Sequence, residues 1–108
     1  MEKYPFAELT IYYTDREADE GVRCRLEISE DNCTLVFDQT EGIDKLVKVV
    51  KWSGKGHNGH YELSGEVPGR ERTKCRATLH RFPDANVLDG FWKEHGFTGM
   101  WRITLLKN

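Results

Sequence analysis

The stretch VLDGFWKEHGFTGMWRITL, which spans residues 87–105, decides the fold. Apolar and polar side chains alternate on both sides of its centre, and this period of two is typical of paired β-strands. When paired residues have numbers that sum to 191, Trp92 lies opposite Gly99 and Trp101 lies opposite Gly90. Each indole can then cover the bare backbone of the neighbouring strand. The stretch therefore predicts an antiparallel hairpin with both tryptophans on one face.

The second face of this hairpin supports the same register. It pairs one acid with one base and one aromatic ring with one thioether, and such cross-strand neighbours are favourable. The loop of the hairpin then comprises residues 94–97. The pairs on this face are Asp89 and Arg102, Phe91 and Met100, and Lys93 and Thr98.

Alternation of the same kind recurs along the whole chain. Turn-forming residues separate the runs, and no useful stretch of helical period remains. Strands with short connections pair with antiparallel neighbours, and eight of them either close into a barrel or split into two packed sheets. We therefore expect an all-β fold, an antiparallel up-and-down eight-stranded barrel, with a two-sheet β-sandwich as the alternative. The expected strands are residues 9–14, 22–29, 33–37, 45–53, 60–67, 74–80, 87–93 and 98–105, and the inner face of 45–53 stays unassigned because both of its faces carry apolar residues.

A second hairpin fixes the distance between two of the three cysteines. A sum of 61 pairs Leu26 with Leu35 and Cys24 with Phe37. Cys24 and Cys33 are then four residues out of register, about 13 Å along a strand, which is beyond disulfide reach. The cysteines are odd in number and form no C-x-x-C motif, so we expect reduced thiols in a cytoplasmic protein.

The hairpin around residues 68–69 has two possible registers. A sum of 138 places Glu62 opposite Arg76, whereas a sum of 140 places Glu66 opposite Lys74. In both registers an acid faces a base within the sheet, which is a favourable cross-strand pair. Part of the basic C-terminal third is therefore expected to be neutralised inside the protein.

Composition places the chain among ordinary soluble domains. It has 108 residues, a net charge of −2 and 11% aromatic residues, so we expect one domain over residues 1–108. No apolar run approaches the roughly 20 residues of a membrane helix, and the N-terminus lacks the apolar segment of a signal peptide. The net charge is −5 over residues 1–31 and +4 over residues 70–108. Because the chain is not basic overall and carries no nucleic-acid motif, we expect neither a nucleic acid nor a membrane as partner.

Few residues suggest catalysis or metal binding. The predicted inner face offers tyrosines, thiols and apolar groups, but none of the carboxylates, histidines or lysines that acid–base catalysis commonly uses. We therefore expect no enzyme, no catalytic residue and no cofactor. His57 and His60 fall in a glycine-rich segment, residues 54–60, that is expected to be a flexible hairpin loop. Two histidines need further ligands to hold a metal, so no metal site is expected.

Two binding functions remain open. An eight-stranded barrel can hold one small ligand or be filled by its own side chains. For an interior site, the candidate ligand-binding residues are Tyr13, Tyr61, Trp92 and Trp101, which predict a small apolar molecule. The alternative is a filled core and a protein-interaction module or homodimer that uses Phe91 and Met100 on the outer face.

The G-x-W elements Gly90-Phe91-Trp92 and Gly99-Met100-Trp101 carry a resemblance to known proteins. Together with the eight short strands, they resemble the calycin-type barrels of lipocalins and avidins. The resemblance departs from the lipocalin pattern, which places its G-x-W on the first strand. The chain is also similar to small bacterial β-barrel proteins that end in a repeated glycine–tryptophan hairpin. The resemblance implies a barrel and ligand binding, and transfers no binding residue.

Overall fold

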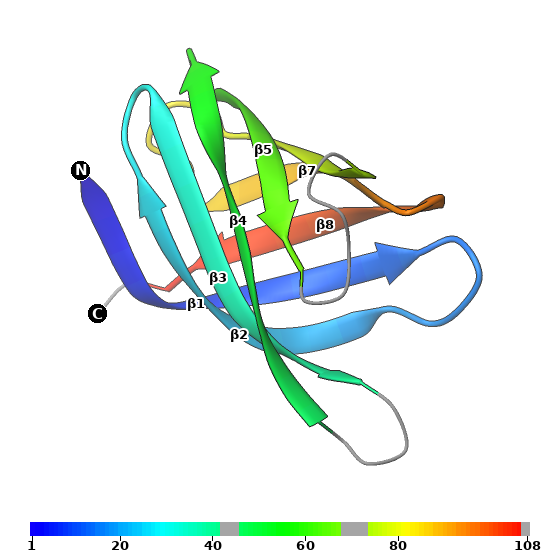
Figure 1. Cartoon of the computed structure of the whole chain (residues 1–108). Coiled ribbons are helices and arrows are strands. Elements are labelled where there is room, and N and C mark those ends of the chain that lie inside the picture. The colour runs from blue at the N-terminus through cyan, green and yellow to red at the C-terminus, as the bar shows by residue number, and fades with distance from the viewer. Residues whose placement is uncertain (42–45, 68–73, 107–108) are drawn as a thin grey trace.

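The computed structural model describes residues 1–41, 46–67 and 74–106. Eight antiparallel strands follow one another around a closed barrel, each paired with its two neighbours in sequence, and β1 closes the barrel against β8 (Figure 1). The all-β up-and-down barrel is thereby confirmed, and the sandwich alternative is wrong. The closed eight-stranded form is consistent with a calycin-like architecture. The strands are β1 (Glu2–Tyr13), β2 (Asp19–Ile28), β3 (Asn32–Glu41), β4 (Leu46–His57), β5 (His60–Glu66), β6 (Cys75–His80), β7 (Val87–Glu94) and β8 (Phe97–Leu105).

The hairpin of β7 and β8 has the predicted register. Trp92 pairs with Gly99, Gly90 with Trp101, and Phe91 with Met100. The pairing continues through Glu94 and Phe97, so the turn has only two residues rather than four. Both turn residues, 95 and 96, have positive φ, as in the primed turns that match the twist of a hairpin.

The other predicted registers give one confirmation and one correction. Leu26 pairs with Leu35 and Cys24 with Phe37, as a sum of 61 requires. In the hairpin of β5 and β6, Glu62 lies opposite Thr78 rather than Arg76, so the sum of 138 is wrong and the sum of 140 applies. Alternation alone cannot separate these registers, because a shift of two residues keeps every side chain on the same face.

The segment expected as a loop over residues 54–60 is mostly strand. β4 continues to His57 and β5 begins at His60, with a two-residue turn between them. The ring of Tyr61 packs where a side chain on Gly56 would lie, and a side chain on Gly54 would overlap the backbone of β5. Glycine is needed here for close approach within a regular ladder, which explains why a loop was expected.

The barrel interior is packed with apolar side chains. The inner face of β4, which the sequence left unassigned, carries Val50 and Trp52, while Val49 is exposed. All three cysteines are buried free thiols. Burial raises the pKa of Cys24 and of Cys33 to about 12. The largest fully buried side chains are Leu9, Leu26, Ile28, Leu35, Leu63, Leu79, Leu88 and Ile103.

The two predicted tryptophan–glycine contacts tie three strands together. Trp101 passes over Gly90 and donates its indole N–H to the Thr78 carbonyl on β6, with an N···O distance of 3.0 Å. Trp92 packs on Gly99 and donates to the Met100 carbonyl at 3.2 Å. These bonds satisfy the only polar atom of each indole inside an apolar core. They also link β6, β7 and β8 into one wall of the barrel.

Candidate functional site

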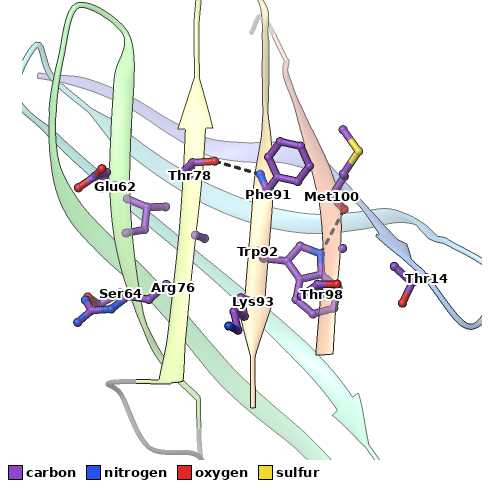
Figure 2. Close-up of a pocket in the computed structure, with 13 residues that line it drawn as sticks. Thr14, Glu62, Ser64, Arg76, Thr78, Phe91, Trp92, Lys93, Thr98 and Met100 are labelled. Atoms are coloured by element: carbon purple, nitrogen blue, oxygen red, sulfur yellow. Dashed lines mark hydrogen bonds between the residues drawn. The ribbon is translucent and has the colours of Figure 1, made fainter. Parts of the chain in front are cut away.

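The outer face of β5–β8 carries a broad groove of about 920 Å³ (Figure 2). Barrel walls are hyperboloid in shape, so they can be concave along the strands although they are convex around the axis. The groove-lining residues whose side chains point outward are Glu62, Ser64, Arg76, Thr78, Phe91, Lys93, Thr98 and Met100.

Two cations lie side by side in this groove. Arg76 on β6 is directly opposite Lys93 on β7, and both are exposed. Arg76 donates to the hydroxyl of Ser64 on β5. Within the described part of the chain, neither cation forms an ion pair with a carboxylate. Like charges directly opposite on a sheet repel, so this pair forms a positive site in the groove, with the exposed carboxylate of Glu62 on the neighbouring strand β5.

An exposed apolar row runs beside the two cations. Phe91 on β7 pairs with Met100 on β8, and Met100 pairs with Tyr12 on β1, so the three outward side chains are neighbours across three strands. Their exposed fractions are 61%, 48% and 43%, respectively. The predicted interface residues Phe91 and Met100 are therefore brought together, and Tyr12 joins them through barrel closure. Tyr12 was not among the predicted interface residues, because its contact with Met100 requires the pairing of β1 with β8.

The strand ladder opens next to this apolar row. Ala77 pairs with Trp92 and His80 with Asp89, and regular pairing is interrupted between them. The amide of Phe91 donates to the Thr78 side-chain hydroxyl at 3.1 Å instead of to a backbone carbonyl. Figure 2 shows this bond on the floor of the groove. Phe91 points outward at the edge of the groove, in line with the alternation of exposed and buried residues along β7.

The barrel interior holds a much smaller space, at the end where β7 and β8 are joined. A pocket of about 30 Å³ lies among Tyr13, Trp92, Trp101 and the unforeseen Trp52. Trp52 meets Trp101 edge to face, with ring centroids 5.3 Å apart, and Tyr13 meets Trp92 in the same way at 5.6 Å. Three of the four predicted ligand-binding residues therefore gather here, around a volume the size of one water molecule.

Tyr13 is held by polar contacts at the rim of this pocket. Its hydroxyl donates to the Asp19 carboxylate at 2.6 Å, and the Arg16 guanidinium lies over its ring, with Cζ 3.9 Å from the ring centroid. Burial, together with the bond to Asp19, raises the pKa of Tyr13 to about 12. The phenol therefore remains a neutral donor near neutral pH.

The fourth predicted ligand-binding residue, Tyr61, lies at the opposite end of the barrel. Its hydroxyl donates to the Ser29 carbonyl at 2.6 Å, and burial raises its pKa. Beside it, Arg81 forms an ion pair with Glu2 at 2.7 Å and donates to the Ala85 carbonyl at 2.8 Å. The structure therefore does not bring Tyr61 into one site with the other three residues.

The structure places a third histidine, His80, in line with His57 and His60, the two noted in the sequence. His57 pairs with His60 across β4 and β5, and His60 pairs with His80 across β5 and β6. His80 was missed because only the correct register of β5 and β6 places it beside His60. Over the described residues, no group of three or more histidine, cysteine or acidic side chains is close enough together to hold a metal ion.

No helix among the described residues is long and apolar enough to span a membrane. Comparison with known proteins gives no match: no protein-family model, no curated protein and no solved structure is significantly similar to this chain.

Proposed function

We propose that the chain is a non-enzymatic interaction module that binds an acidic protein segment with apolar side chains in its outer groove. The observation that carries this proposal is the Arg76–Lys93 couple, which forms no ion pair with a carboxylate of the described residues, beside the exposed row of Phe91, Met100 and Tyr12. A partner carboxylate would relieve the repulsion between the two cations. An apolar side chain next to it would bury the exposed row.

The composition of the groove supports a protein partner. Aromatic residues, methionine and arginine are enriched at protein interfaces relative to the remaining surface. Contiguous exposed apolar groups rimmed by polar residues are typical of such sites, whereas single exposed apolar residues are ordinary. The groove volume of about 920 Å³ gives room for several side chains of an extended segment. Its strands are fixed by the Trp92 and Trp101 hydrogen bonds, so the site is largely preformed.

A small apolar ligand inside the barrel stays a second prediction. The aromatic mouth of Tyr13, Trp52, Trp92 and Trp101 supports an apolar or aromatic guest. However, ligand pockets commonly measure about 300–1,000 Å³. The pocket among these rings holds about 30 Å³, so a ligand seated there would have to displace the indoles, and we rank this function below the groove.

The predictions about family relationship, cellular location and partners belong to the same proposal. A relationship to lipocalins and avidins is supported by barrel architecture alone. The three buried free thiols are compatible with a reducing cytoplasm. A homodimer is the main competing form of the groove function, since a second copy would offer the acidic residues of its own segment 15–20. We propose neither nucleic acid nor membrane as a partner.

An NMR titration tests the groove. An acidic peptide that contains Phe and Leu among Asp and Glu is added to ¹⁵N-labelled protein, with a basic peptide of the same apolar pattern for comparison. We expect the acidic peptide alone to shift amides of β6–β8, and the double reversal Arg76→Glu with Lys93→Glu to weaken binding about tenfold or more. The control Arg25→Glu, at an exposed site on β2, makes the same charge change as Arg76→Glu or Lys93→Glu alone, and it should change affinity less than about twofold.

Several outcomes would overturn the proposal. These are an absence of shifts in β6–β8, equal weakening by Arg25→Glu, or shifts confined to the aromatic mouth. Light scattering after size-exclusion chromatography provides a further test, because it measures the oligomeric state. A wild-type dimer that Met100→Asp converts to a monomer would show that a second copy occupies the groove instead of a separate partner. Native mass spectrometry that detects a retained small molecule would support the interior ligand.

A further inference from the structure

A row of outward side chains crosses the barrel wall beyond the groove. His57 on β4, His60 on β5, His80 on β6 and Asp89 on β7 are consecutive partners in the strand register. All four are exposed, and the inward residues next to them in sequence put them on the same outer face. Three imidazoles on adjacent strands are thus neighbours although they are far apart in the chain.

The central two imidazoles are in direct contact through their ring nitrogens. Nδ1 of His60 lies 2.6 Å from Nδ1 of His80, with ring centroids 4.8 Å apart and ring planes at 76°. Two neutral imidazoles in this arrangement share a single proton, which one ring donates to the lone pair of the other. The two Nδ1 atoms therefore converge on one point in space at the protein surface.

We propose that His60 and His80 form a two-imidazole site for a divalent first-row transition metal ion, with Zn²⁺ and Cu²⁺ as the candidate ions. Imidazole nitrogen suits both of these ions. This departs from the expectation of no metal site, which considered His57 and His60 without His80. The proposal is independent of what occupies the groove.

The geometry requires only a small adjustment. With metal–nitrogen bonds of about 2.0–2.1 Å, two ligands are separated by about 3.3 Å in a tetrahedral site and by about 2.9 Å at a right angle. The observed separation of 2.6 Å reaches these values by slight rotations of two exposed rings. Water supplies the other positions, because both rings face solvent. The proton between the rings moves to Nε2 of the donor ring, so the neutral pair binds the ion without net proton release.

The surrounding charge favours a cation modestly. Asp89 lies opposite His80 and accepts a bond from Arg102 at 3.1 Å, so its charge is partly compensated. Glu62 is the next outward residue along β5 from His60. These carboxylates lie near the two rings and are not placed as ligands. The affinity for the metal ion should therefore come mainly from the two Nδ1 atoms of His60 and His80.

Calorimetry with zinc sulfate tests the site, with copper sulfate in a parallel titration. We expect one ion per chain, and His60→Gln or His80→Gln should each weaken binding about tenfold or more. The control His95→Gln, in the turn between β7 and β8, should leave affinity within about twofold. A ¹⁵N spectrum of the imidazoles should show metal bound through Nδ1 of both rings.

The same variants keep the test independent of folding. His60 and His80 are exposed, so their glutamine variants should give the native amide spectrum. Wild-type affinity in the double variant His60→Gln with His80→Gln would place the ion elsewhere and overturn the proposal. Failure of wild-type protein to bind either ion at about 1 mM would also overturn it, since two ordered imidazoles should bind well below that concentration.

Discussion

Glycine and tryptophan act as matched partners at single positions of this barrel. A side chain at Gly90 would overlap the Thr78 carbonyl oxygen, which is the acceptor for Trp101. A side chain at Gly99 would meet the Trp92 ring. Both pairings follow from the sequence, because the alternation of residues 87–105 allows the indoles to face only glycine in that register. The acceptor on Thr78 could not be foreseen, because it belongs to another hairpin.

Substitution of Gly90 tests this matching. We expect Gly90→Ala to lower the free energy of unfolding by about 2–3 kcal/mol, because the new methyl group pushes β6 away and weakens the bond between Trp101 and Thr78. The control is Gly21→Asn, at a positive φ with nothing within 4 Å, which should cost less than about 1 kcal/mol. Urea unfolding followed by tryptophan fluorescence measures both. Equal losses would show that the contact at Gly90 is unimportant.

At the scale of strands, the sequence predicted which residues form strands and which face inward better than it predicted which residues pair across strands. Period-two alternation located all eight strands and most inner faces. It could not choose between registers that differ by two residues, so Glu62 was given Arg76 as a possible partner although Thr78 faces it. The same limit hid the contact of His60 with His80 and left Lys93 unrecognised as the neighbour of Arg76. Candidate sites on the outer face depend on these registers.

The first half of β1 has its own source of stability. Among the described residues, residues 2–4 pair with β2 alone, because pairing of β1 with β8 begins at Ala7. The ion pair between Glu2 and Arg81 fastens this end to the loop after β6. The bond to Arg81 also lowers the pKa of Glu2. This stabilisation is therefore present above the ordinary carboxyl pKa and lost as the pH falls through the lowered value.

Hydrogen exchange at neutral pH tests that attachment. We expect Glu2→Gln to speed exchange about five- to tenfold at the amides of residues 2–4 that bond to β2, while amides from Leu9 to Tyr13 keep their rates. The matched control is Asp89→Asn, which breaks an exposed ion pair within two regular strands and should change little. Uniformly faster exchange across β1 in Glu2→Gln would contradict a local role for the ion pair.

For the molecule as a whole, closure joins the two ends of the chain in one sheet. The pairing of β1 with β8 means that every strand is stabilised on both sides and that no strand is left as an edge. The sequence indicated this closure only through strand number and short connections. The packed core that results leaves about 30 Å³ at the aromatic mouth and places the larger concavity outside.

The same packed interior should make the protein sensitive to alkali. Burial raises the pKa of Cys24 and of Cys33 from an ordinary value of 9.0 to about 12. Between these limits the unfolded chain loses thiol protons that the folded chain retains, so stability is complete below pH 9 and falls as the pH rises. The loss is at most about 1.4 kcal/mol per pH unit for each thiol. We expect the guanidinium midpoint, measured under reducing conditions from pH 8 to 10, to fall steeply above pH 9. Cys24→Ala with Cys33→Ala should flatten this slope, whatever its effect on stability at pH 8, and an unchanged slope would assign the alkaline transition to other groups.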